Sequence, residues 1–129
     1  MQVTGFSHVT INVTTLARSL PFYSGLLGMV IVHQGEHDAY LTWGDAWLCL
    51  QEGVEAGTRQ PGCGVDHLAF RIAAEGFAAA VALLKRAHVP IVREPVQRGA
   101  GWSVNFLDPD GTQLELHTST LEERMLVWQ

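Results

Sequence analysis

Two histidines and one glutamate stand at matched places in two similar halves of the chain. His8 and His67 each follow a glycine, Gly5 or Gly64, by three residues, and each is followed by a run in which apolar residues alternate with others. Glu115 lies in a later alternating run of the second half. Neutral imidazole and carboxylate groups suit a borderline divalent metal, and a set of three such ligands leaves coordination positions open for substrate. The pattern therefore predicts a metal-dependent active site.

The elements that must position these residues occur twice. In each half, a strand-like run after the histidine is followed by a helix-like segment and then by further strands, the last two joined by a short polar turn. The match places Glu115 where Cys49 stands in the first half. We therefore expect an α+β fold of two βαβββ modules in a single domain over residues 1–129: module one over about 4–52, a linker over about 53–63, module two over about 64–119 and a tail over 120–129.

Four local features refine this expectation. Pro21 removes a backbone donor, so the first helix should kink there or begin late. Residues 95–101 contain a proline and glycines and are expected to form a loop. Asp66 should point to the face opposite His67 because neighbouring residues of a strand alternate. The tail over 121–128 is expected to be a short helix.

Composition favours a small-molecule protein. The chain has 129 residues, 47% of them hydrophobic, and a formal net charge of -5 without charge runs, which argues against nucleic acid as a partner. Neither a long apolar run nor a signal peptide is present, so no membrane partner and a cytoplasmic location are expected. The two cysteines, Cys49 and Cys63, are expected to be free thiols.

Several other residues near the pattern are open to more than one interpretation. His117 follows Glu115 by two residues on the same strand face, and it is either a packed surface residue, a partner of a ligand, or a further ligand. Cys49 is either a buried apolar thiol or a metal ligand. No ligand role is assigned to His33, His37 or His88.

These residues resemble the vicinal oxygen chelate superfamily, which groups glyoxalase I, extradiol dioxygenases, bleomycin-binding proteins and fosfomycin-resistance enzymes. The paired βαβββ pattern, the three predicted ligands and the turn at 107–111 cover nearly the whole chain. Within the superfamily the fosfomycin-resistance enzymes are the most similar. The stretches that carry this likeness are 5–13, 22–28, 39–41, 47–50, 115–117 and 121–124.

The resemblance implies a cup-shaped mixed sheet around the metal, with helices on the outside. It also implies a homodimer in which His8 of one subunit joins His67 and Glu115 of the other. The metal is usually Mn²⁺, although Fe²⁺, Co²⁺, Ni²⁺ or Zn²⁺ suit the same ligands. It polarises the epoxide of fosfomycin, which a thiol such as glutathione or bacillithiol, or water, then opens. Family cavity positions are matched by Thr10, Tyr40, Trp47 and Arg124, and Arg124 is expected to bind the phosphonate.

The chain departs from the thiol-transferring members in a second cavity loop. Their lysine, serine and tyrosine correspond to Pro95, Gly99 and Asn105, which argues against K⁺ binding and weakens the case for glutathione. Asn105 and Arg98 are nevertheless retained as candidates for substrate binding, and Arg93 is an alternative source of charge. The 68–72 and 120–124 stretches look more like the water-adding branch, whose general base corresponds to His37, beside Glu36.

Three other functions, two enzymatic and one non-catalytic, remain alternatives. A glyoxalase-type isomerase typically has a fourth protein ligand to the metal. In this chain Cys49 or Trp47 occupies the position expected for that ligand. An extradiol dioxygenase would keep the metal and act on a catechol. A non-catalytic drug-binding resistance protein would generally lack the three predicted ligands. Thus the sequence favours a metal-dependent enzyme that opens an epoxide, as a transferase or a hydrolase.

Overall fold

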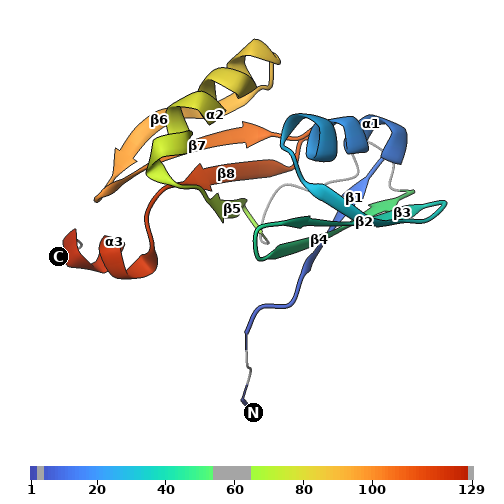
Figure 1. Ribbon diagram of the computed structural model, residues 1–129, viewed down its shortest axis with the longest axis horizontal. Coiled ribbons are helices and arrows are strands. Elements are labelled where there is room, and N and C mark those ends of the chain that lie inside the picture. Colours follow the sequence, from blue (N-terminus) through green and yellow to red (C-terminus); the bar gives the residue numbers. More distant parts are fainter. Residues whose placement is uncertain (3–4, 54–64, 128–129) are drawn as a thin grey trace. The chain divides into compact units, whose positions relative to one another are not determined.

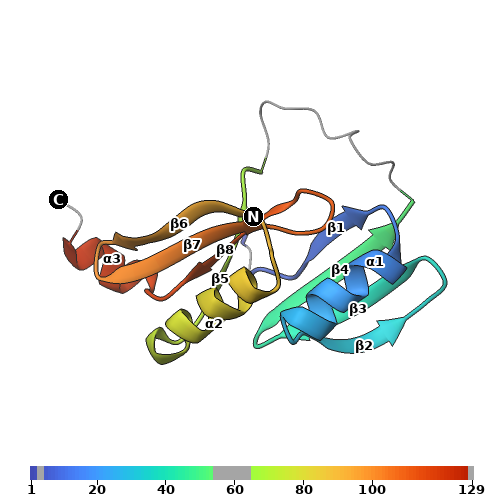
Figure 2. The ribbon, with the colours of Figure 1, turned by 90° about the horizontal axis from the view of Figure 1, so that it is seen from above.

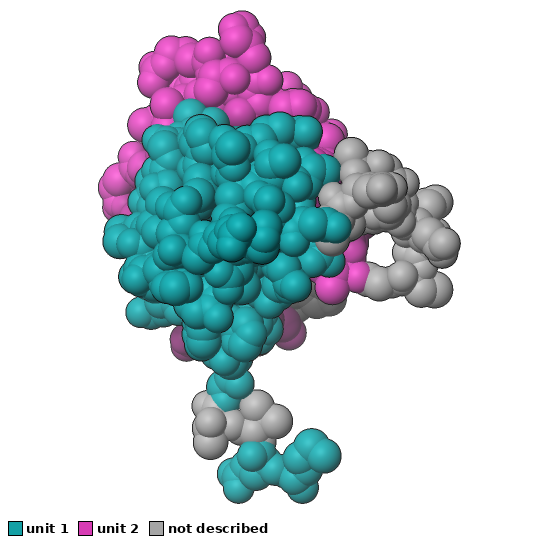
Figure 3. Space-filling view, turned by 90° about the vertical axis from the view of Figure 1, so that its right-hand side faces the viewer, with its two compact units in different colours: residues 1–61 teal, residues 62–129 magenta. Residues whose placement is uncertain are grey.

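The computed structural model describes residues 1–2, 5–53 and 65–127 (Figure 1). The chain divides into two compact units, Met1–Pro61 and Gly62–Gln129 (Figure 3), and the division falls in the predicted linker. Each unit contains a four-stranded sheet, which confirms the α+β class and the duplicated pattern. Among the described residues, no helix has the length and apolar character needed to span a membrane.

The first unit packs a short helical segment on a mixed sheet. Its elements are β1 (Val9–Val13), α1 (Leu16–Leu20), η1 (Pro21–Leu26), β2 (Val30–Gln34), β3 (Asp38–Trp43) and β4 (Ala46–Glu52). The strand order is β1-β4-β3-β2, with β1 parallel to β4 and the other pairs antiparallel. One face is buried because apolar residues alternate along the strands, and α1 and η1 lie over the sheet (Figure 2).

The helix changes type at Pro21, and it does not begin late, which was one of the two expectations for this proline. The α-helix ends at Leu20, and a π-helical turn begins at Pro21, which lacks the N–H needed to continue the regular ladder. The amide of Leu27 donates to the carbonyl of Phe22, five residues back, at 2.9 Å. At the other end, the amide of Leu16 donates to a carboxylate oxygen of Glu52 at 2.7 Å and so ties the helix start to the end of β4.

The second unit repeats the topology. Its elements are β5 (Leu68–Arg71), α2 (Ala74–Arg86), β6 (Ile91–Arg98), β7 (Gly101–Leu107), β8 (Gln113–His117) and α3 (Leu121–Val127), and the strand order is β5-β8-β7-β6. Val104, Phe106, Leu114 and Leu116 are buried on one face, and Ser103, Asn105 and Glu115 alternate with them on the other. The register confirms the predicted match, since Cys49 pairs with Thr10 as Glu115 pairs with Ala69.

The loop expected over 95–101 is mostly strand. β6 continues through Pro95 to Arg98, and only a two-residue turn separates it from β7. A proline fits here because β6 is the edge strand, and its pairing with β7 shifts register between Arg93 and Val96. The composition predicted a loop that begins at Pro95, and the continued pairing of β6 with β7 beyond this residue shows that prediction to be wrong.

Candidate functional site

His67 and Glu115 meet on the polar face of the second sheet. His67 precedes β5, and its Nε2 atom lies 2.8 Å from Oε2 of Glu115, which projects from the neighbouring β8. The other ring nitrogen, Nδ1, lies 2.7 Å from a carboxylate oxygen of Asp66. Strand alternation predicted that Asp66 would point away from His67. Instead its carboxylate contacts the His67 ring. Both residues precede β5, so the alternation of a strand does not apply to them.

This geometry fits a divalent metal. A hydrogen bond from Nδ1–H to Asp66 leaves a lone pair on Nε2 of His67, which then faces a carboxylate oxygen that is also only an acceptor. Two acceptors at 2.8 Å require a proton or a cation between them. Histidine ligands of metals commonly donate their second N–H to a carboxylate, as His67 can to Asp66. The donor types and their convergence both suit a metal.

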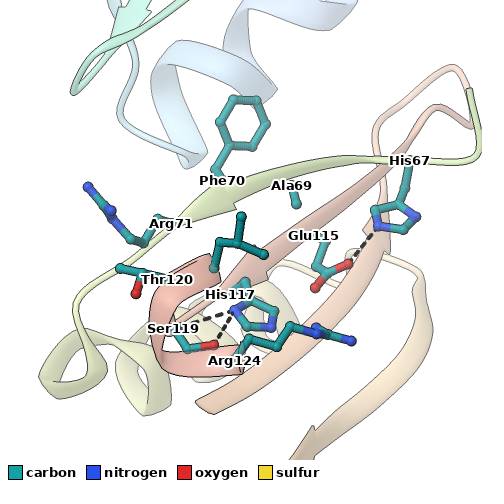
Figure 4. Close-up of a pocket in the computed structure, with 10 residues that line it drawn as sticks. His67, Ala69, Phe70, Arg71, Glu115, His117, Ser119, Thr120 and Arg124 are labelled. Atoms are coloured by element: carbon teal, nitrogen blue, oxygen red, sulfur yellow. Dashed lines mark hydrogen bonds and ion pairs between the residues drawn. The ribbon is translucent and has the colours of Figure 1, made fainter. Parts of the chain in front are cut away.

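A pocket of about 340 Å³ opens beside this pair (Figure 4). Its volume suits a small ligand. The pocket is lined by residues of β5, β8 and α3, by the residue before β5 and by the segment between β8 and α3: His67, Ala69, Phe70, Arg71, Glu115, His117, Ser119, Thr120, Leu121 and Arg124. Two guanidinium groups and the predicted metal ligands His67 and Glu115 thus border one cavity, and the guanidinium groups favour a ligand that carries negative charge.

The start of α3 positions Arg124 by a reciprocal cap. The amide of Thr120 donates to the Glu123 carboxylate at 2.8 Å, and the amide of Glu123 donates to the Thr120 hydroxyl at 3.2 Å. The predicted helix is confirmed over Leu121–Val127. Because α3 begins at the pocket, Arg124 in the first part of this helix reaches the cavity (Figure 4).

His117 is fixed in one tautomer. The backbone amide of Ser119 donates to Nδ1 of His117 at 3.1 Å, which leaves the proton on Nε2. That Nε2 atom is buried and has no hydrogen-bond partner among the described residues. His117 lines the pocket, so the simple surface-packing interpretation of its sequence position is incomplete.

The first unit gathers several other predicted residues on one sheet face. His8 lies against Trp47, with ring centroids 4.5 Å apart, and Tyr40 meets Trp47 edge-on at 6.0 Å. Thr10, Cys49 and Tyr40 occupy one row across β1, β4 and β3, so their side chains share that face. Four predicted residues, His8, Thr10, Tyr40 and Trp47, are therefore neighbours.

The thiol of Cys49 is expected to react slowly at neutral pH. Burial raises its pKa, the carboxylate of Asp38 raises it further, and a hydrogen bond with Thr10 partly offsets both. A raised pKa lowers the thiolate fraction at any given pH. In a Cys63→Ser variant, alkylation of Cys49 should therefore reach its half-maximal rate at a higher pH than alkylation of a model peptide thiol. A midpoint at or below that of the peptide would contradict this account.

The remaining candidates lie elsewhere on their units. His37 and Glu36 occupy the exposed turn between β2 and β3, where the His37 side chain is 70% exposed and lies 3.5 Å from Glu52. Arg98 ends β6 and does not line the pocket. No group of three or more potential metal ligands gathers among residues 1–2, 5–53 and 65–127. The roles of His8, Glu36, His37 and Arg98 thus stay predictions.

Comparison with known proteins decides the family. Residues 5–116 match the Glyoxalase/Bleomycin resistance protein/Dioxygenase superfamily. The chain belongs to this superfamily. It is 39% identical over 121 residues to the glutathione transferase FosA of Serratia marcescens, covering 92% of this chain and 84% of that protein. It is 33% identical over 126 residues to the metallothiol transferase FosB of Staphylococcus epidermidis, covering 97% and 89%.

A solved structure extends this similarity. The fosfomycin resistance protein FosX of Listeria monocytogenes, in complex with Mn(II) and sulfate, matches with a TM-score of 0.81 and 27% identity over 97% of this chain and 98% of that one. A structure of a glutamate-to-glutamine mutant of the same FosX holds Mn(II) and 1S,2S-dihydroxypropylphosphonic acid. The expected resemblance to fosfomycin-resistance enzymes within this superfamily is confirmed.

Sequence reasoning missed several residues that line the pocket. Arg71 follows His67 by four residues, and its alignment with His117 across β5 and β8 places it on the polar face. The alternation after His67 could have identified it. Ser119 and Thr120 carry no such signal, because their role comes from hydrogen bonds to His117 and Glu123.

Proposed function

We propose that this protein is a divalent-metal-dependent enzyme that opens the epoxide of fosfomycin, or of a similar small oxyanion, by adding a thiol or water. The observation that carries the proposal is the pairing of His67 with Glu115 at 2.8 Å beside a pocket lined by two arginines. The similarity to FosA, FosB and FosX supports the choice of substrate.

The metal would be held by His67 and Glu115, with His8 as the third ligand. Mn²⁺ is the first choice because FosX was solved with Mn(II). When bound, the metal supplies a Lewis acid that polarises the epoxide oxygen. We propose that His8 comes from the partner subunit of a homodimer, as the family resemblance implies. Asp66 holds His67 in the tautomer that presents Nε2, and Trp47 packs against the His8 ring.

Arg124 binds the phosphonate in this proposal, and Arg71 adds positive charge to the same cavity. A guanidinium group matches two oxygens of such an anion at once, which fixes the substrate in orientation as well as in place. An epoxide is already strained, so correct placement of its carbon against the nucleophile supplies much of the rate. In the proposed homodimer, Thr10, Tyr40 and Trp47 would come from the same subunit as His8, because they share its sheet face.

Two nucleophiles are compatible with the site. FosA is named a glutathione transferase and FosB a metallothiol transferase, which favours a thiol. The dihydroxypropylphosphonic acid bound by FosX is the diol that water addition to an epoxypropylphosphonate would give. For water, His37 is the proposed base, because it stands in the loop before Tyr40, where the resemblance to the water-adding branch places a general base. Thiols are kept reduced in the cytoplasm, which is where we propose that the enzyme acts.

Phosphorus NMR of fosfomycin tests this function and identifies the nucleophile. The Mn²⁺-loaded protein is incubated with fosfomycin in parallel samples that contain water only, glutathione, cysteine or bacillithiol. A new phosphorus signal is expected in at least one sample, and a protein-free control of each must lack it. An unchanged spectrum in all samples, with metal confirmed in the protein, would contradict the choice of fosfomycin.

A further inference from the structure

Asn105 contacts the predicted metal ligand rather than the pocket. Its Nδ2 atom donates a hydrogen bond to Oε2 of Glu115 at 3.3 Å. The contact is built into the sheet, because Asn105 on β7 is the register partner of Glu115 on β8. Asn105 is 0% exposed and does not line the pocket, so a ligand in the pocket does not reach it.

The amide can take only one orientation. A carboxylate accepts hydrogen bonds and does not donate them, so the NH₂ group of Asn105 must face Glu115. Its carbonyl oxygen, Oδ1, then remains buried without a hydrogen-bond partner among the described residues. A leucine would fill similar space without a buried polar atom, so the amide is best explained by what its N–H group does.

That N–H group acts on the atom that matters for metal binding. Oε2 of Glu115, which accepts from Asn105, is the same oxygen that faces Nε2 of His67. A buried donor at this oxygen holds the carboxylate in the rotamer that converges with the histidine. Outer hydrogen bonds of this kind commonly raise metal affinity by about 10- to 100-fold.

We propose that Asn105 is a positioning residue that aligns the Glu115 carboxylate for the metal, and that it does not bind substrate. The proposal rests on the metal site of the proposed function. It replaces the substrate-binding role that the sequence predicted for Asn105. A substrate-binding role would change KM and leave metal affinity alone, whereas a positioning role changes metal affinity in the absence of substrate.

The test is a Mn(II) titration of the substrate-free protein, followed by the electron paramagnetic resonance signal of free Mn(II). Asn105→Leu keeps the branched shape and the number of heavy atoms of the side chain and removes the donor. Its Kd for Mn(II) should rise by about 10- to 100-fold. Ser103→Ala is the matched control: Ser103 is equally buried on the same face of β7, and its hydroxyl has no hydrogen-bond partner among the described residues.

The outcomes separate this inference from the proposed function. Equal Kd values for the wild type and Asn105→Leu would overturn the positioning role alone. A wild-type protein that does not bind Mn(II) would overturn the proposed metal site and the positioning role together. Circular dichroism checks that each variant is folded, and Asn105→Ala, which removes the same donor with less risk of overpacking, replaces Asn105→Leu if the latter does not fold.

Discussion

A protein in which Glu115 is replaced by glutamine is expected to lose its divalent metal and its turnover. Glutamine keeps the shape of the side chain but removes the negative charge that faces His67 at 2.8 Å. Loss of an outer hydrogen bond to a ligand already lowers metal affinity by about 10- to 100-fold. Loss of the charge of a ligand should therefore lower metal affinity by more than about 100-fold. Metal analysis after equilibrium dialysis against Mn²⁺ measures the effect directly.

Glu94→Gln is the matched control for this substitution. Glu94 lies on β6 and pairs with Lys85 on α2 at 2.9 Å, with both side chains largely exposed. Exposed pairs of this kind contribute little to stability, so the variant should bind metal and turn over like the wild type. Retention of stoichiometric metal by Glu115→Gln would rule out Glu115 as a ligand.

Replacement of Arg124 by alanine is the second substitution with a large expected effect. If Arg124 binds the phosphonate, its removal leaves a charged group of the substrate without its partner in the pocket. Loss of such a partner costs about 2–4 kcal/mol, which corresponds to a fall of about 30- to 1000-fold in kcat/KM. Metal affinity should not change, because Arg124 is not one of the proposed metal ligands.

Two further variants sharpen the Arg124 prediction. Arg124→Lys retains the positive charge but not the planar set of N–H donors that can bind two oxygens at once. It should therefore recover only part of the lost kcat/KM. Thr120→Ala removes the hydroxyl acceptor of the reciprocal cap but keeps the amide that donates to Glu123, and it should cost about 1 kcal/mol of local stability, with a smaller fall in kcat/KM. Arg86→Ala, at the exposed end of α2, is the control substitution. Arg124→Ala with wild-type kcat/KM would exclude Arg124 from substrate binding.

The sequence contained enough information to predict the repeated sheets. Alternation of apolar and polar residues has a period of two, which is the period of the strand pleat, so the alternation of exposed Thr10 and Asn12 with buried Ile11 and Val13 followed from counting residues. The match between Cys49 and Glu115 followed in the same way and is confirmed by register. At Pro21 the missing backbone donor marked where the helix changes, although the prediction was a kink or a late start and not a π-helical turn.

Other features could not be predicted because periodicity specifies a face and not the contacts made on it. Asp66 turns toward His67 because both residues precede the strand, where the side chain is free to meet the ring nitrogen. β6 continues across Pro95 because an edge strand can absorb a shift of register. The bond from Asn105 to Glu115 depends on the offset between β7 and β8, which no single strand determines.

The central claim is that the residues around His67 and Glu115 make a metal-dependent epoxide-opening site. The most direct measurement is the rate at which the fosfomycin phosphorus signal disappears, with the preferred nucleophile, for one protein sample before and after removal of metal by a chelator and again after addition of Mn²⁺. The account predicts turnover in the original sample, none after chelation and recovery with Mn²⁺. Undiminished turnover in the metal-free sample would contradict it.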